Sequence, residues 1–213
     1  MTVDQASTRR VLYLSYDGMT DPLGGSQVLP YLAGLAALGH SIDLISCEKP
    51  GIADRQWDEV RARCASGGIA WHPIAYHKRP PVVSTVWDMA AMKRKAWVLA
   101  AAGQFDVVHC RSYIAAIVGL AMKARFGTRF LFDMRGFWAD EKVEGGSWPQ
   151  SNPLFRAVYR HFKRRETDFL QGADVTVSLT RTARDELLTR PAAGRPPQRI
   201  EVIPCCVDFD HFA

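Results

Sequence analysis

The stretch RVLYLSYDGMTDPLGGSQVLPYLAGLAALGHSIDLIS, residues 10–46, contains the pattern that decides the fold. It begins with a short apolar run, passes through a glycine-containing turn, continues as an amphipathic segment and returns to a second apolar run. Short, nearly continuous apolar runs are typical of strands that are buried on both faces of a parallel sheet. The stretch therefore predicts a strand, a helix and a second strand. The helix is predicted to end at Leu38, and Gly39 follows it as a residue type favoured just beyond helix ends.

The same alternation continues to the end of the chain. Strands are predicted at 10–16, 41–47, 69–75, 106–110, 129–134, 175–179 and 200–203. Helices are predicted at 26–38, 53–65, 84–102, 112–126, 153–170 and 180–189. This order predicts an α/β fold with a doubly wound, Rossmann-like parallel sheet. Since ligands of such sheets bind beyond the carboxyl ends of the strands, the candidate residues are sought there.

Composition and charge narrow the function classes. The 213 residues include 27 basic and 22 acidic ones, and the resulting net charge of +5 favours anionic partners. Five cysteines without a Cys-x-x-Cys spacing predict reduced thiols and no zinc site. No run reaches the roughly 18 apolar residues that span a bilayer, and the first ten residues lack a signal-peptide core. We expect a cytoplasmic protein, at most peripheral at the inner face of a membrane, with no nucleic-acid partner.

Two basic segments are candidates for that peripheral contact. The first is the helix predicted over 153–170, which could present its basic side to anionic lipid headgroups. The second, weaker candidate is Lys93-Arg94-Lys95 beside Trp97. A solvated helix face is the alternative for both. The basic residues of the first segment are Arg156, Arg160, Lys163 and Arg164.

A glycine-rich turn follows the first strand and leads into a helix predicted to begin at Ser26. Gly24 and Gly25 allow close approach of a ligand to the backbone, and a helix start offers free N–H groups to an anion. The spacing is neither the Gly-x-Gly-x-x-Gly pattern nor a P-loop, which weakens generic dinucleotide and nucleoside-triphosphate interpretations. A simple tight turn is the alternative.

His109 and Arg111 stand at the end of the fourth predicted strand, in the sequence DVVHCRS. Residues two apart share one face of a strand, so both side chains are expected to point the same way. Histidine can hydrogen-bond a sugar hydroxyl or exchange a proton near neutral pH, and arginine binds a phosphate or carboxylate bidentately. The alternative is a structural histidine, against which the presence of Arg111 argues.

The run FDMRGFWADE, residues 132–141, is the densest polar and aromatic cluster in the chain. An arginine there can neutralise a phosphate, carboxylates can bind hydroxyls, and aromatic rings can pack against a sugar. An ion pair that braces a loop is the alternative. Residues 144–149 are predicted as a mobile loop over the cleft. The candidate ligand-binding residues are Arg135, Phe137, Trp138, Asp140 and Glu141.

Taken in order, these motifs resemble the amino-terminal domain of retaining family 4 glycosyltransferases. Residues 10–46 are similar to that family's opening strand, glycine-rich loop and Gly-His turn. DVVHCRS is similar to its fourth strand, and FDMRGFWADE to the ligand loop after its fifth. ADVTVSLTRTARDEL, residues 173–187, and IEVIPCCVDFDHF, residues 200–212, are similar to the segments that lead into its carboxyl-terminal domain.

The resemblance implies that residues 1–213 form the acceptor-side, amino-terminal half of a GT-B fold, whose donor-binding domain lies outside this chain. It implies retaining transfer of a hexosyl group from a nucleotide-sugar donor to a sugar or lipid-linked acceptor, without a metal or further cofactor. His109 is implied to be catalytic, and the turn from Gly24 to Ser26, including Gly25, to bind the donor phosphates. The implied acceptor-binding residues are Arg111, Arg135, Phe137, Trp138, Asp140 and Glu141.

Two other functions compete with a transferase domain. The chain could be a non-catalytic subunit that binds an acceptor or partner chain and completes a split transferase. It could also be another α/β enzyme, such as an epimerase or phosphatase, against which the missing nucleotide fingerprints count.

Arg111 stands where many relatives of the family carry a second histidine, and this difference indicates a charged acceptor.

Overall fold

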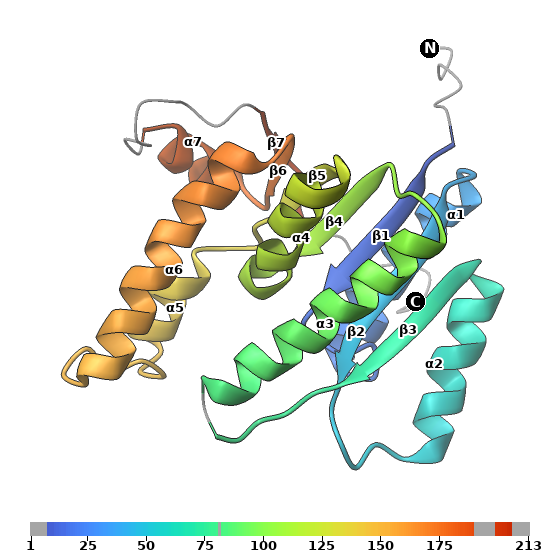
Figure 1. The fold of residues 1–213 in the computed structure, drawn as a ribbon, viewed down its shortest axis with the longest axis horizontal. Helices are drawn as coiled ribbons and strands as arrows, with labels where there is room; N and C mark the ends of the chain where they lie inside the picture. The colour runs from blue at the N-terminus through green and yellow to red at the C-terminus, as the bar shows by residue number, and fades with distance from the viewer. Residues whose placement is uncertain (1–7, 81, 190–198, 206–213) are drawn as a thin grey trace. The chain divides into compact units, whose positions relative to one another are not determined.

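The computed structural model describes residues 8–80, 82–189 and 199–205. Among them, seven parallel strands form a sheet in the order β3-β2-β1-β4-β5-β6-β7 (Figure 1). The predicted α/β, Rossmann-like class is therefore confirmed. The chain divides into two compact units, one that ends at Val108 and one that runs from His109 to Cys205. Cys206 and the rest of the predicted exit motif lie outside the described residues.

The first unit alternates strands and helices as predicted. Its neighbouring strands pair in parallel, with Tyr13 opposite Leu44 and Leu44 opposite Trp71. In chain order it contains β1 (Arg10–Ser15), the π-helical turn η1 (Gly24–Val28), α1 (Leu29–Ala37), β2 (Ser41–Glu48), α2 (Asp54–Ser66), β3 (Ile69–Ala75) and α3 (Val83–Ala102).

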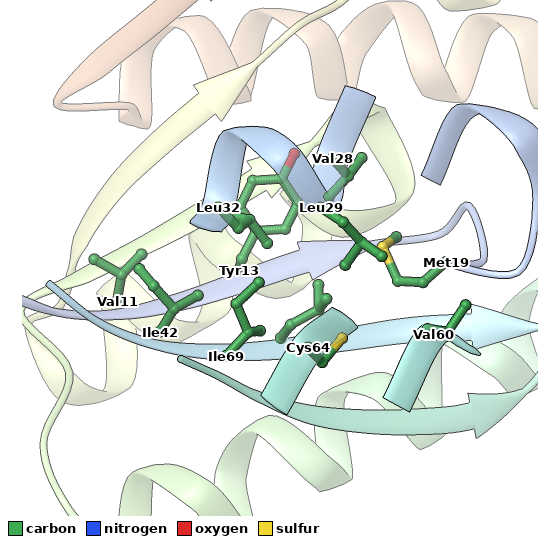
Figure 2. Packing of buried hydrophobic residues seen from close by; sticks show 11 residues of the cluster. Val11, Tyr13, Met19, Val28, Leu29, Leu32, Ile42, Val60, Cys64 and Ile69 are labelled. Atoms are coloured by element: carbon green, nitrogen blue, oxygen red, sulfur yellow. The ribbon is translucent and has the colours of Figure 1, made fainter. Parts of the chain in front are cut away.

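A buried apolar cluster holds α1 and α2 against one face of this part of the sheet. Successive residues of a strand point to opposite faces, so Val11 and Tyr13 of β1, which are two apart, reach the same cluster. In Figure 2 the ring of Tyr13 points towards α1 and lies beside Leu32. In Figure 1, α3 crosses in front of β1 and β2, while α1 lies behind them. The cluster comprises Val11, Tyr13, Met19, Val28, Leu29, Leu32, Ile42, Leu44, Val60, Cys64 and Ile69.

The second unit is organised around an aromatic core. The ring of Tyr113 contacts those of Phe132 and Phe169 edge to face, with centroids 5.6 and 6.1 Å apart. Gly127 ends α4 in the left-handed conformation that favours glycine. The unit contains β4 (Val107–Arg111, which begins at the boundary), α4 (Ser112–Phe126), β5 (Arg129–Asp133), α5 (Trp138–Glu144), α6 (Pro153–Gly172), β6 (Val175–Ser178), α7 (Arg181–Thr189) and β7 (Ile200–Val202).

The prediction of a ligand loop after β5 is wrong in part, because residues 138–144 form the short helix α5. Asp140 and Glu141 lie in its first turn, where negative charge is favourable to the helix dipole. The segment after α5, predicted as a mobile loop, contacts α5 through Trp148. The N–H of Trp148 donates to the Lys142 carbonyl at 2.9 Å, and its ring packs on Trp138.

Gly119 lets α4 lie close to the sheet in the second unit. A Cβ atom at this position would lie 2.3 Å from Cys110 Sγ and 2.8 Å from the Phe130 ring. We expect Gly119→Ala to lower the free energy of unfolding by about 1–3 kcal/mol through overpacking. The matched control is Gly34→Ala in α1, where nothing lies within 4 Å. That change should stabilise by roughly 0.5–1 kcal/mol. Urea unfolding measures both, and equal stability of the two variants would contradict the packing argument.

In the part of the chain that the structure describes, no helix is long and apolar enough to cross a membrane.

Candidate functional site at the carboxyl ends of the strands

The glycine turn of the first unit is helical rather than an open loop. Gly24 and Gly25 lie inside η1, which is continuous with α1, and the chain is already helical at Pro22. The N–H of Gly25 donates to the Asp21 carbonyl at 3.0 Å. The prediction of a helix that begins at Ser26 is therefore wrong, because the helical hydrogen bonding starts earlier. Ser26 donates its hydroxyl hydrogen to the Pro22 carbonyl at 2.7 Å.

Close backbone packing explains the glycine at position 24. A Cβ there would lie 2.1 Å from the Gly18 carbonyl oxygen and 2.6 Å from Met19 Cα, so no larger residue fits. Gly24 is buried, whereas Gly25 and Ser26 are partly exposed. The guanidinium of Arg63 on α2 donates to the Gly25 carbonyl at 2.6 Å. The exposed part of the turn thus carries a positive charge that the sequence pattern does not reveal.

Glu48, the last residue of β2, organises the loop between β1 and η1. Its buried carboxylate accepts hydrogen bonds from the Met19 N–H at 2.8 Å and the Thr20 N–H at 3.1 Å. It also accepts the hydroxyls of Thr20 at 2.6 Å and Ser46 at 2.5 Å. Four donors converge on one carboxylate, so the position of residues 18–20 is set by a residue at the end of the neighbouring strand.

In the second unit, three polar residues meet where β4 and β5 end. Asp133 Oδ2 lies 3.7 Å from His109 Nε2 and 3.9 Å from Arg135 Nη1. Both distances are longer than a hydrogen bond, so neither contact saturates the carboxylate. The other oxygen, Asp133 Oδ1, is buried and has no hydrogen-bond partner among the described residues. Because a buried acceptor without a donor is costly, this oxygen can receive a ligand hydroxyl or a water.

The backbone is strained immediately after both of these strands. Ser112, after β4, has φ +66°, and Arg135, after β5, has φ +62°. Such values are uncommon for residues other than glycine, and they cluster at functional sites when the surrounding structure enforces them. Arg135 is held further by its Nη2, which donates to Cys205 Sγ at 2.9 Å. The arginine therefore spans from β5 to the segment after β7.

The other predicted ligand residues divide into two groups. Arg111 is buried at the end of β4, one position before α4, and Phe137 is partly exposed at the start of α5. Glu141 is exposed, and its carboxylate lies over Gly136, where a Cβ would be 2.3 Å from Oε1. Arg111 thus lies on the same strand as His109, and Phe137 and Glu141 lie in the segment after β5.

Asp140 and Trp138 are engaged in packing between α5 and α6. Asp140 accepts hydrogen bonds from Tyr159 Oη at 2.8 Å and Lys163 Nζ at 2.9 Å. The Trp138 ring stacks on Tyr113 at 5.6 Å and meets Phe162 edge to face at 4.9 Å. The alternative of an ion pair that braces this segment thus applies to Asp140, with a lysine as the partner instead of an arginine.

The sequence pattern indicated His109 and Arg135 but not Asp133, which lies between them. The available signal was an acidic residue at the end of a largely buried strand, and Glu48 ends β2 in the same way. Gly24 and His109 belong to different units. Their convergence on one crevice stays a prediction.

Three of the four described cysteines serve as core residues. Cys47, Cys64 and Cys110 are buried free thiols, and Cys205 is an exposed free thiol. Burial raises the pKa of the Cys64 thiol to about 11. Within residues 8–80, 82–189 and 199–205, no group of three or more His, Cys, Asp or Glu side chains is arranged to hold a metal ion.

Comparisons with known proteins agree with this architecture. The model of the family described as Glycosyltransferase Family 4 matches residues 25–211. A search of curated proteins found no match. Solved structures match in fold. The sucrose-phosphate synthase from Thermosynechococcus elongatus matches with a TM-score of 0.64 and 13% identity over 95% of this chain and 49% of that one.

Two further matches are complexes. HepE from Anabaena, in complex with UDP and glucose, gives a TM-score of 0.58 at 10% identity, over 95% of this chain and 46% of that one. UGT2 from Phytolacca americana, complexed with UDP-2fluoro-glucose and pterostilbene, gives a TM-score of 0.63 at 8% identity, over 94% of this chain and 55% of that one. At these identities the likeness concerns the fold. The chain spans about half the length of these three structures.

Proposed function

This chain belongs to glycosyltransferase family 4, and we propose that it is the acceptor-side domain of an enzyme that moves a sugar from a nucleotide-sugar donor to an acceptor hydroxyl. Retention of anomeric configuration is part of the proposal, as is a donor-binding domain outside these residues. Two structural neighbours, in complexes with UDP and glucose or a UDP-fluoroglucose, support a nucleotide-sugar donor.

The observation that carries the proposal is the group formed by buried His109, buried Asp133 and partly exposed Arg135. Sugar transfer separates a diphosphate from a sugar that develops positive charge. Groups that are already oriented towards these charges stabilise the transition state most. We assign Asp133 Oδ1, which lacks a donor within the described residues, to a sugar hydroxyl. Arg135 offers a positive charge to phosphate or to a charged acceptor.

His109 is proposed as the catalytic residue beside the reacting sugar. Its ring is buried, and its Nε2 faces the Asp133 carboxylate at 3.7 Å. A carboxylate at this distance favours one orientation of the imidazole ring. We further assign the exposed part of the glycine turn, Gly25 and Ser26, to the donor phosphates, with Arg63 as an additional positive charge.

The proposal is tested by donor hydrolysis and transfer with the full-length protein. We expect release of nucleoside diphosphate from one member of a panel of UDP-, GDP-, ADP- and dTDP-sugars, measured by coupled assay and mass spectrometry. The 213-residue chain alone should give no turnover, because it supplies one wall of the site. Robust sugar transfer by this chain alone would contradict the domain assignment. Full-length protein that binds a partner but never consumes a donor would favour the non-catalytic subunit.

A further inference from the structure

One face of α3 exposes large apolar side chains to solvent. Val83 is 62% exposed, Val86 53% and Trp87 68%. Their spacing of three and four residues places them on one side of the first turns of the helix. The opposite side is buried through Ser84, Asp88, Met92 and Ala96. Adjacent apolar side chains with this exposure mark an interaction surface rather than scattered surface residues.

Basic residues flank this apolar group at both ends. Lys78 and Arg79 are exposed in the segment before α3, and Lys93 and Arg94 are exposed farther along the same helix. Lys93 Nζ lies 4.8 Å from the centre of the Trp97 ring. The sequence from 77 to 102 contains one acidic residue, Asp88, and its side chain is fully buried. The charge that this segment presents to solvent is therefore entirely positive.

Asp88 fixes the start of α3 to the carboxyl ends of β1 and β3. Its Oδ2 accepts hydrogen bonds from Tyr16 Oη at 3.1 Å and the His77 N–H at 3.0 Å. Its Oδ1 lies 2.5 Å from His77 Nδ1. Burial raises the pKa of the Tyr16 hydroxyl well above its ordinary value, which keeps Tyr16 a neutral donor to Asp88. The exposed apolar residues thus lie on a helix that Asp88 joins to the carboxyl ends of β1 and β3.

We infer that this surface of α3 docks on an anionic lipid membrane. We call it the α3 face, and define it by Lys78, Arg79, Val83, Val86, Trp87, Lys93 and Arg94. Aliphatic and indole side chains insert at the boundary between headgroups and acyl chains, while lysine and arginine bind anionic headgroups. A central apolar group with positive charge on both sides matches both layers of such a surface. The inference does not depend on the proposed transferase activity.

The basic helix α6, the first candidate from the sequence, fits this role less well. Lys163 is engaged by Asp140 and Glu166, both at 2.9 Å from its Nζ, so it does not belong to a free basic face. Arg156 and Arg160 are exposed, but among the described residues of α6 the exposed large apolar side chain is that of Leu154. Positive charge with little apolar surface gives weak, salt-sensitive attraction, which makes α6 a suitable control.

Vesicle binding by the full chain tests the inference. We expect the protein to co-sediment with vesicles of roughly 70% phosphatidylcholine and 30% phosphatidylglycerol, whose surface is negatively charged. It should not co-sediment with vesicles of phosphatidylcholine alone. Lys93→Gln with Arg94→Gln should weaken binding by about 25-fold, at roughly fivefold per charge. Val83→Ser with Trp87→Ser should weaken it by about tenfold or more. The charge-matched control, Arg156→Gln with Arg160→Gln, should change it less than about threefold.

Circular dichroism of each variant checks that the fold is retained; since all substituted side chains are exposed, the wild-type spectrum is expected. The membrane assignment is overturned if the wild type does not bind anionic vesicles, or if the α6 variant loses binding while both α3 variants keep it. It is also overturned if the wild type forms a dimer in sedimentation velocity that Val83→Ser with Trp87→Ser abolishes and vesicles do not compete for. That result would assign the α3 face to a second copy of the chain.

Discussion

Asp133→Asn is expected to lower kcat of the full-length transferase by roughly 100- to 1,000-fold while leaving its fold intact. The substitution keeps the shape of the side chain but removes the negative charge between His109 and Arg135. It also replaces one of two acceptor oxygens with a donor, which suits neither a sugar hydroxyl nor the histidine. Because this group is proposed to act on the transition state, kcat should fall more than KM rises.

The stability of this variant separates a role in the reaction from a role in folding. Asp133 makes two long ion-pair contacts and leaves Oδ1 without a partner among the described residues, so neutralising it removes little stabilisation. We expect a change in unfolding free energy below about 1 kcal/mol by urea titration. Asp168→Asn, at an exposed carboxylate paired with Arg165, is the matched control and should leave both kcat and stability unchanged.

Companion variants show whether the three residues act as a unit. His109→Ala and Arg135→Ala should each reduce turnover without unfolding the domain. The double variant His109→Ala with Asp133→Asn should lose less than the product of the single effects, because each change removes the same oriented pair. Wild-type turnover in the Asp133 and His109 variants would remove these assignments from the mechanism.

The sequence predicted the sheet well because its signal is local. Each strand is a short apolar run, and most helices end beside a glycine, so the boundaries of α2, α3 and α4 differ from the predicted ones by at most one residue. The predicted start of the first helix was wrong because glycine ordinarily favours a turn over a helix. At position 24 the close approach of Gly18 decides instead, and that contact cannot be read from the pattern.

The helix α5 was missed for a related reason. Its seven residues are too few to show a helical period, and its stability comes from packing. Trp138 meets Tyr113 and Phe162, which are 25 and 24 residues away in sequence. A signal was present, since Asp140 and Glu141 form an acidic first turn. That signal was attributed to ligand binding because the same residues suit both roles.

Much of the candidate site depends on contacts between distant parts of the chain. His109 and Arg135 could be identified because they follow strands and carry distinctive side chains. Asp133 and Glu48 acquire their importance from partners on neighbouring strands or loops, and those partners depend on strand order. Parallel neighbours are set by the crossover helices rather than by local pattern. The sequence therefore identified strand ends as the place to look, but not which acid would lie at the centre.

The buried carboxylate of Glu48 should contribute far more to the stability of the first unit than an exposed ion pair such as Arg55–Glu59 does. We expect Glu48→Ala to lower the free energy of unfolding by about 3–5 kcal/mol. The change leaves the Met19 and Thr20 N–H groups and two hydroxyls without their acceptor in a buried site. It also leaves a cavity beside Gly18, where a Cβ would already lie 2.7 Å from Glu48 Oε2.

Glu48→Gln distinguishes hydrogen bonding from simple volume. Glutamine fills nearly the same space, but its amide nitrogen is a donor and would face donors from Met19, Thr20 or Ser46. If hydrogen bonding dominates, this variant should lose about 2–4 kcal/mol, close to the alanine variant. If volume dominated, glutamine would restore most of the stability.

Tryptophan fluorescence gives a local readout of this loss. Ser46 Oγ donates to Glu48 and accepts a hydrogen bond from Trp71 Nε1 at 2.8 Å, and Trp71 packs on Trp57 at 5.3 Å. Urea unfolding followed through this emission should therefore shift to lower midpoints in both Glu48 variants. Glu59→Ala, at an exposed carboxylate paired with Arg55, should change the free energy of unfolding by less than about 0.5 kcal/mol. A Glu48→Ala protein as stable as Glu59→Ala would mean that the loop after β1 holds its shape without this carboxylate.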